Sequence, residues 1–365
     1  MKIVLVNNNV IHESDLGLFV YKETGKFFND IKELGHRVIV FQYSMKMKES
    51  DFLSNYNIED KGFTLKIVKR GKISFFAFVK AFFKGIRVVL KADFIYLFYP
   101  GNLCIYLALL ALLFGKGYGF YVRGENKIMS PISRFLYKRA KVVFTISPRF
   151  TEMIKDFGAN SKTIRPMMVF GDKDIIHNRQ YKSKTKYKLL FVGRIERDKG
   201  VFEIIEAISI LHNQNIDNFE MHFVGDGIDL VKMKSEIQEA GLCDLVFFHG
   251  TIVDKQKLRE FYIKSDLFIL PSHHEGFPRV LYEAMIHGIP ILSTFVGTIS
   301  YLLKDKVNCN KLEVRDSTLI VKYVKAFLTN YEENGIIAKN GTKTIIDYLS
   351  DKKDEHSLQL HKEIK

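Results

Sequence analysis

The stretch that decides the fold runs from Asp266 to Gly297 and reads DLFILPSHHEGFPRVLYEAMIHGIPILSTFVG. The apolar run Leu267 to Leu270 is short enough to be a buried parallel strand. A helix is predicted over Pro278 to His287, because proline suits the first helical position. Gly288 then stands where a left-handed C-cap belongs. Ile289 to Ser293 predicts the next strand, so the stretch is a strand–loop–helix–strand unit.

Two glutamates lie in this unit with seven residues between them. Glu275 belongs to the loop and Glu283 lies about one turn into the helix. Because ligands of open α/β sheets bind at the carboxyl ends of the strands, we expect both carboxylates to face that crevice. The spacing alone equally allows a solvated Glu275 and a helix-surface pair between Glu283 and Arg279.

The residues around the two glutamates favour the functional interpretation. Gly276-Phe277-Pro278 stands between them and Glu283-Ala284-Met285 follows, which resembles the signature of family four retaining glycosyltransferases. That family belongs to the GT-B superfamily, glycosyl transferases group 1. The resemblance implies an α/β fold of GT-B type, with two facing Rossmann-like domains, parallel sheets and a cleft between them. It also implies metal-independent transfer of a sugar from a nucleotide diphosphate sugar, with retention of configuration.

Length, charge and cysteine content limit the possible domain number, partners and compartment. A chain of 365 residues, 47% of them hydrophobic, is long enough for two domains. Lys and Arg number 55 against 41 Asp and Glu, and a net charge of +14 indicates a polyanionic partner or a membrane surface. No nucleic-acid reader motif is found, so we expect no nucleic acid. Three widely spaced cysteines favour a reducing compartment.

Neither a signal peptide nor a membrane span is expected. The apolar run at the start is too short for a signal peptide, and the longest one, Leu103 to Phe114, falls short of the roughly 20 residues that cross a bilayer. We therefore expect a cytoplasmic protein that is peripheral at the inner face of the cell membrane.

The order of predicted elements divides the chain in two. Strands alternate with helical segments in both halves, including a predicted helix from Leu18 to Leu34. We expect an N-terminal acceptor-binding domain over residues 1–166 and a C-terminal nucleotide-sugar domain over 167–350. The polar stretch from Gly171 to Lys186 predicts the interdomain linker. A charged terminal helix over 351–365 packs back onto the first domain, as the resemblance implies.

The segment from Ser74 to Leu90 combines apolar and basic residues at helical spacing. The apolar positions are Phe75, Phe76, Val79, Phe82, Phe83, Ile86 and Val89, and another face carries Lys80, Lys84, Arg87 and Lys91. One interpretation is a crossover helix with its apolar side on the sheet and a solvated basic face. The other is a helix at an anionic membrane surface. Both hold if the helix packs by one side and rests on lipid by another.

A second candidate site opens the C-terminal half. Gly193, Arg194, Lys199 and Gly200 lie on a predicted strand-to-helix loop. A loop with glycines, two cations and a following helix N-terminus suits an anion. The resemblance implies that Arg194 and Lys199 hold the donor diphosphate and that Glu275 binds the donor sugar, so these three are the expected catalytic residues.

The resemblance also assigns the donor-binding residues. Glu283 would accept hydrogen bonds from the ribose hydroxyls, since a carboxylate offers acceptors only. The expected donor-binding residues are Gly17, Gly193, Ile252, Gly276, Phe277, Pro278 and Glu283. Neither a metal nor another cofactor is expected. The pair Asp172 and Asp174 has the Asp-x-Asp pattern of metal-dependent transferases, but it falls in the predicted linker.

The first domain departs from the family pattern, and this leaves alternatives open. Gly17 is single where the family has two glycines, and Arg123 takes the place of a frequent histidine, with Glu125 beside it on the acceptor side. The acceptor is expected to be a glycan or lipid-linked sugar in cell-surface polysaccharide assembly. A sugar-nucleotide 2-epimerase of GT-B architecture, or a catalytically inactive GT-B partner or membrane-binding protein, are the alternatives.

Overall fold

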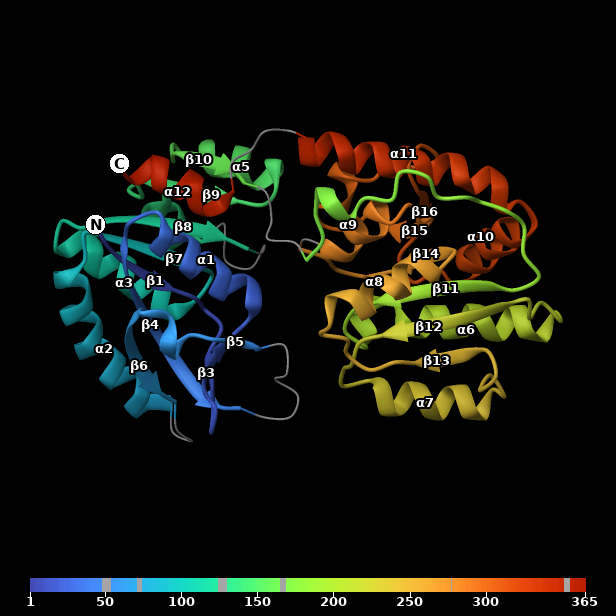
Figure 1. The fold of residues 1–365 in the computed structure, drawn as a ribbon, viewed down its shortest axis with the longest axis horizontal. Coiled ribbons are helices and arrows are strands. Elements are labelled where there is room, and N and C mark those ends of the chain that lie inside the picture. The colour runs from blue at the N-terminus through green and yellow to red at the C-terminus, as the bar shows by residue number, and fades with distance from the viewer. Residues whose placement is uncertain (48–53, 71–73, 124–129, 165–168, 277, 351–354) are drawn as a thin grey trace. The chain divides into compact units, whose positions relative to one another are not determined.

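The computed structural model describes the chain except for residues 48–53, 71–73, 124–129, 165–168, 277 and 351–354 (Figure 1). The chain forms two compact units. Unit 1 comprises Met1–Met167 together with Lys353–Lys365, and unit 2 comprises Met168–Lys352. None of the described helices has the length and apolarity that a bilayer crossing needs.

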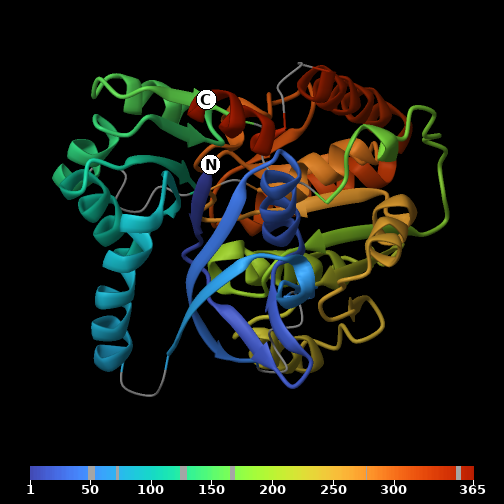
Figure 2. The same ribbon diagram turned by 60° about the vertical axis from the view of Figure 1, so that its left-hand side comes forward.

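Unit 1 is built on a sheet of ten described strands in the order β10-β9-β8-β7-β1-β4-β2-β3-β5, with β6 also paired to β4. The strands are β1 Lys2–Val6, β2 Ile11–Ser14, β3 Gly17–Val20, β4 Arg37–Lys46, β5 Tyr56–Asn57, β6 Thr64–Lys69, β7 Phe94–Tyr99, β8 Gly117–Val122, β9 Val142–Thr145 and β10 Ser161–Thr163. The helices are α1 Lys22–Glu33, η2 Glu59–Lys61, α2 Ser74–Lys91, α3 Asn102–Leu113, α4 Pro131–Tyr137, α5 Pro148–Lys155 and α12 His356–Ile364. Figure 2 shows α2 running along one side of this unit.

Unit 2 is built on a fully parallel sheet in the order β13-β12-β11-β14-β15-β16. Its strands are β11 Tyr187–Val192, β12 Phe219–Val224, β13 Val246–Phe248, β14 Leu267–Leu270, β15 Ile291–Thr294 and β16 Asn310–Leu312. Its helices are η3 Asp172–Asp174, η4 Arg197–Lys199, α6 Val201–Asn213, α7 Leu230–Glu239, α8 Lys255–Lys264, α9 Arg279–Ile286, η5 Ile299–Tyr301, α10 Ser317–Thr329 and α11 Tyr331–Ser350. The strand order reverses between β11 and β14, which makes this the topological switch point where open α/β sheets bind ligands.

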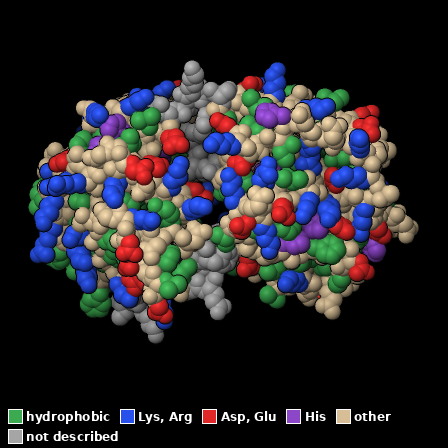
Figure 3. Space-filling model, in the orientation of Figure 1, with side chains coloured by type: hydrophobic (Ala, Val, Ile, Leu, Met, Phe, Trp, Pro, Cys, Tyr) green, Lys and Arg blue, Asp and Glu red, His purple; other side chains and the backbone are tan. Residues whose placement is uncertain are grey.

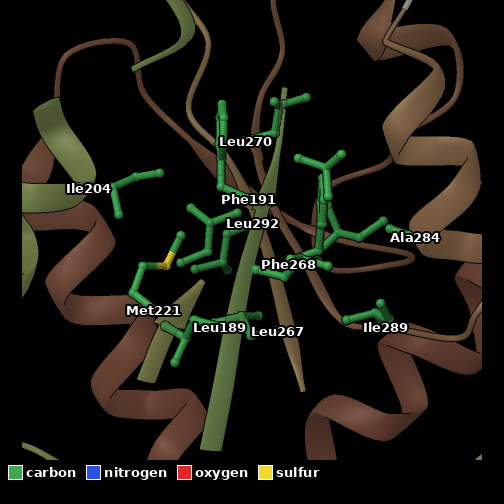
Figure 4. Packing of buried hydrophobic residues seen from close by; sticks show 14 of the residues in the cluster. Leu189, Phe191, Ile204, Met221, Leu267, Phe268, Leu270, Ala284, Ile289 and Leu292 are labelled. Carbon is green, nitrogen blue, oxygen red and sulfur yellow. The ribbon is translucent and has the colours of Figure 1, made fainter. Parts of the chain in front are cut away.

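The core of unit 2 lies between this sheet and its helices. Figure 4 shows Phe191 of β11, Phe268 of β14 and Leu292 of β15 gathered with Ile204 of α6 and Ala284 of α9. All five side chains are buried. The central strands read as continuous apolar runs because a parallel sheet covered by helices on both faces buries successive side chains.

The predicted helix from Leu18 to Leu34 is partly wrong. The helix begins at Lys22, and the chain before it forms β3, which pairs antiparallel with β2. In turn, β2 pairs with β4, joining Ile11 to Ser44. Gly17 has a φ of +121° and starts β3. On its other side β3 pairs with β5, joining Phe19 to Asn57, so a strand partner far along the chain overrides the local helical pattern.

The predicted linker from Gly171 to Lys186 is also wrong, because this segment packs on unit 2. The Arg179 guanidinium donates hydrogen bonds to the carbonyls of Tyr262, Ser265 and His287, at the carboxyl ends of α8 and α9. The Tyr181 hydroxyl donates to the Gly288 carbonyl at 2.7 Å. A cation suits these helix ends, whose last carbonyls have no partner within the helix.

The orientation of α2 reverses most of the expected packing. Its buried residues are small or branched: Ala77, Ala81, Gly85, Val88 and Val89. Tyr106 of α3 packs so closely that a Cβ at Gly85 would lie 2.8 Å from its Cε1. Phe76, Phe82 and Phe83, expected on the sheet, are exposed instead. Among the described side chains of the expected apolar set, Val89 is the one that is fully buried, and the side chain of Phe75 lies outside the described part of the structure. Close approach to α3 selects the small residues.

Candidate functional site

The candidate site is the pair of loops that follow β11 and β14 at the switch point. Lys199 ends η4 on the first loop, and Glu275 lies on the second. The Lys199 Nζ donates to Glu275 Oε1 at 2.9 Å, with the two side chains only 13% and 11% exposed. A buried ion pair at the strand ends is therefore the centre of the site.

Neighbouring groups hold the Glu275 carboxylate in one orientation. The Ser272 hydroxyl donates to the same Oε1 at 2.7 Å, while Lys199 also donates to the His274 carbonyl at 3.3 Å. Because Oε1 already accepts from an ammonium and a hydroxyl, its position is fixed before any ligand binds.

The end of β15 and the loop after it hold the Glu275 loop in place through hydrogen bonds. The hydroxyl of Thr294 donates to the Ser272 carbonyl and that of Thr298 to the Gly276 carbonyl, each at 2.6 Å. A Cβ at Gly297 would lie 1.8 Å from the Glu275 carbonyl oxygen, and its φ is +59°. Only glycine fits this contact, since an L side chain is excluded both by the space and by the left-handed backbone.

A second support comes from α6. The His273 amide donates to the Asp198 carbonyl at 2.8 Å, and its Nε2 lies 2.8 Å from Glu203 Oε1. Gly200, at φ +70°, brings the first loop against Pro271, where a Cβ would lie 2.2 Å from the Pro271 carbonyl oxygen. The two site loops are thus packed directly on each other.

Arg194 is on the first loop but outside the buried pair. Its side chain is 63% exposed and its Nη1 contacts Glu196 Oε2 at 2.5 Å. Gly193 precedes it and donates its amide to the Val224 carbonyl at 3.0 Å, which joins this loop to the end of β12. Arg194 is therefore a cation on a solvated surface next to the pair.

Glu283 lies deeper than the sequence indicates. It is buried on α9, where its Oε2 accepts from the Tyr262 hydroxyl of α8 at 2.7 Å. Burial raises the pKa of Tyr262 well above its ordinary value, and the Glu283 carboxylate beside it raises the pKa further. The ring of His287 stacks on Tyr262 at 5.0 Å, and burial lowers the pKa of His287 to about 4.

The remaining residues expected at the donor site have these positions. Pro278 is the N-cap of α9 and Gly276 accepts from Thr298. Ile252 is partly buried against the core of unit 2. Phe277 lies outside the described residues. Gly17 belongs to unit 1, in the β2–β3 hairpin.

Asp174, one of the two aspartates of the expected linker, makes structural contacts. Asp174 Oδ2 accepts from the Gly171 amide at 2.9 Å and from Lys255 Nζ at 2.8 Å. The hydrogen bonds and charge of Lys255, together with the Gly171 amide, outweigh burial and lower the pKa of Asp174. Lys255 is therefore engaged by Asp174.

Unit 1 has its own cluster at the carboxyl end of its sheet. Arg123 follows β8 and donates through Nη2 to Asn7 Oδ1, just after β1. Its guanidinium lies 4.7 Å from the ring centroid of Phe98 and 5.5 Å from that of Tyr121. A cation over two aromatic faces is held in place by their quadrupoles. Glu125, expected beside it, lies outside the described residues.

The sequence missed the supporting residues Ser272, His273, Thr294, Thr298 and Tyr262. One of them carried a signal, because Ser272 stands three residues before Glu275. Tyr262 had none, because its contact with Glu283 joins two helices that are 21 residues apart in sequence.

The second half of the chain is similar in sequence to known proteins. Residues 172–344 match the model of the family described as Glycosyl transferases group 1. TuaC of Bacillus subtilis (strain 168), a glycosyltransferase named for teichuronic acid biosynthesis, is 30% identical over 172 residues, 45% of this chain and 41% of that protein. The D-inositol 3-phosphate glycosyltransferase of Arthrobacter sp. (strain FB24) is 32% identical over 123 residues, 33% of this chain and 29% of that protein. The matches thus span less than half of the length of these relatives.

Solved structures extend the likeness to the whole chain. Anabaena HepE in complex with UDP has a TM-score of 0.71 at 16% identity, over 100% of this chain and 98% of that one. At this identity the likeness concerns the fold, and it confirms the expected α/β fold with two Rossmann-like domains. Residues 172–344 of this chain therefore match the glycosyl transferases group 1 family, and the chain has the fold of GT-B glycosyltransferases.

Proposed function

We propose that this protein is a retaining, metal-independent glycosyltransferase that moves a sugar from a nucleotide diphosphate sugar to a glycan or lipid-linked acceptor. The observation that carries the proposal is the buried pair between Lys199 and Glu275 at the switch point of unit 2, with Arg194 beside it. A cation for phosphate and a carboxylate for sugar hydroxyls are the two groups that a nucleotide sugar needs at one place.

The arrangement suits departure of a nucleotide diphosphate. Negative charge develops on the leaving phosphate as the bond to the sugar breaks, and fixed cations aimed at it lower the barrier. Lys199 is already fixed by Glu275, so little reorganisation is needed when its ammonium turns to the phosphate. Arg194, exposed on the same loop, is the second cation. Glu275 then accepts from the hydroxyls of the donor sugar.

Relatives support the donor class and suggest the acceptor class. Anabaena HepE is solved in complex with UDP and with UDP-glucose. TuaC is named for teichuronic acid biosynthesis. We assign this chain by analogy to cell-surface polysaccharide assembly, at the inner face of the cell membrane. The net charge of +14 supports an anionic membrane as the place of work.

A panel of nucleotide sugars tests the proposal. We would measure thermal stabilisation by UDP-glucose, UDP-N-acetylglucosamine and GDP-mannose, since a ligand at 100 times its dissociation constant adds about 2.7 kcal/mol to stability. The donor that binds is then incubated with and without a lipid-linked sugar acceptor. Glycosylated product with the anomeric configuration of the donor, read by NMR, is the expected result.

Two controls sharpen this test. Lys264→Met removes the lysine of an exposed pair with Glu260 on α8 and is expected to leave donor binding unchanged. Lys199→Met is expected to abolish stabilisation by the donor. A 2-epimer of the donor sugar formed without acceptor would show an epimerase instead. No stabilisation by any donor would show an inactive GT-B protein.

A further inference from the structure

The outermost residues of α2 are apolar. Phe83 and Leu90 are 61% and 50% exposed, and Val79 and Phe76 are exposed beside them. These positions follow each other at steps of three, four and seven, so they form one ridge along the helix. The ridge lies opposite the buried stripe of Ala77, Ala81, Gly85 and Val88.

Cations flank this ridge on one side. Lys80, Arg87 and Lys91 are exposed and continue around the helix from the apolar residues. Lys84, expected in the same basic row, is half-buried and donates to the Ile67 carbonyl of β6 at 3.0 Å. Figure 3 shows Lys and Arg side chains gathered along the left-hand edge of the view, where α2 runs. The surface therefore consists of an apolar ridge bordered by positive charge.

We propose that α2 lies in the interface of an anionic bilayer and inserts Phe83, Leu90 and their apolar neighbours between the lipid headgroups. This rests on the membrane location in the proposed function and deepens it from electrostatic attraction to insertion. A helix with exposed aromatic and aliphatic residues on one side and lysines beside them suits this position. Large exposed apolar patches on soluble proteins mark interaction sites, because water makes them unfavourable.

Charge selects lipid over a second copy of this chain. No acidic residue occurs from Lys61 to Ala92, whereas nine basic residues do. A symmetric dimer with antiparallel ridges would oppose the cationic flanks of the two copies, and a parallel one would offer these flanks no acidic residue from the same segment. Anionic headgroups complement the same flank, and each Lys or Arg near such a surface strengthens binding about fivefold.

The absence of tryptophan from the chain gives a direct probe. Phe83→Trp introduces a single indole on the ridge. Vesicles of phosphatidylcholine with about one-third phosphatidylglycerol are added at 0.1 M and 1 M salt, where charges are screened over about 10 Å and 3 Å. We expect a blue shift of emission and quenching by brominated acyl chains. Ile228→Trp in unit 2, at an exposed apolar position, is the matched control and is expected to show neither.

Substitutions separate insertion from attraction. Phe83→Ser with Leu90→Ser is expected to weaken vesicle binding by about tenfold or more, since burying one such side chain is worth this much. Lys80→Gln with Arg87→Gln is expected to weaken it about 25-fold at low salt and little at high salt. Ile228→Ser with Val231→Ser removes exposed apolar surface from unit 2 and is expected to change nothing. Circular dichroism verifies that each variant is folded.

The outcomes distinguish the proposals. Binding to anionic vesicles with no indole shift, and with Phe83→Ser/Leu90→Ser equal to wild type, would overturn insertion and leave electrostatic attachment. No binding to anionic vesicles would overturn insertion and the membrane location together. The donor panel reports on unit 2 without lipid, so it decides the proposed reaction independently.

Discussion

Replacing Lys199 by methionine perturbs both the stability and the reaction, which the sequence alone does not indicate. A lysine on a loop is expected to be exposed, so its loss would leave folding unchanged. In the structure, however, the Lys199 side chain is only 13% exposed and pairs with Glu275 at 2.9 Å. Methionine keeps much of the aliphatic volume and removes the charge. Glu275 is then left largely buried, with the Ser272 hydroxyl still donating to it.

The magnitude follows from the geometry. At an effective dielectric constant of about 20, unit charges 2.9 Å apart attract by about 6 kcal/mol, and the cost of removing both groups from water cancels much of this. Removal of one partner leaves the other charge buried, which costs about 3 kcal/mol. Turnover is expected to fall about 10²–10³-fold, because the main cation facing the leaving phosphate is lost.

Hydrogen exchange in the full-length protein measures the stability change within unit 2. Amides of β11 and β14 report its opening, and about 3 kcal/mol corresponds to exchange roughly 100-fold faster. The double variant Lys199→Met/Glu275→Gln removes the unpaired charge, so it is expected to recover at least half of the stability and none of the turnover. Lys264→Met, from an exposed pair with Glu260, is expected to cost less than about 1 kcal/mol. Exchange within twofold of wild type in Lys199→Met, with normal turnover, would refute the reasoning.

Three further predictions follow from the same unit. Arg194→Ala is expected to lower turnover about 10²-fold with unchanged hydrogen exchange, because this side chain is 63% exposed, and a slower reaction that comes with faster exchange would contradict it. EDTA is expected to leave glycosyl transfer intact, whereas loss of activity restored by Mn²⁺ or Mg²⁺ would give Asp172 and Asp174 a metal-binding role. Burial lowers the pKa of His287 from 6.5 to about 4, so the folded unit keeps it neutral while the unfolded chain binds a proton below pH 6.5. The unfolding free energy of unit 2 is therefore expected to fall as the pH drops from 6.5 to 4, by up to about 3 kcal/mol, and His287→Gln should flatten this slope in an acid titration followed by hydrogen exchange.

The local sequence determined the strand–loop–helix–strand unit that carries Glu275 and Glu283. Strand β14 has the predicted bounds, α9 ends one residue before the predicted His287, and Gly288 has the left-handed φ of +64° that a C-cap needs. These features are set within a few residues by apolar runs, proline and glycine, so a single sequence suffices to predict them. The positions of Lys199 and Glu275 on two loops of one sheet followed from strand-to-helix order alone.

Contacts between distant segments decided the rest. The burial of Lys199 against Glu275 and the hydroxyl of Tyr262 on Glu283 join loops and helices that are far apart in sequence. Contacts with a distant segment also decide which side of α2 is buried. Its sequence has two apolar stripes at helical spacing, one of phenylalanines and one of alanine and glycine. Tyr106 of α3 approaches Gly85 so closely that only the small stripe fits against the protein. Phe76 and Phe83 therefore face outward, because steric fit between two helices, and not hydrophobicity alone, determines which side of a helix is buried.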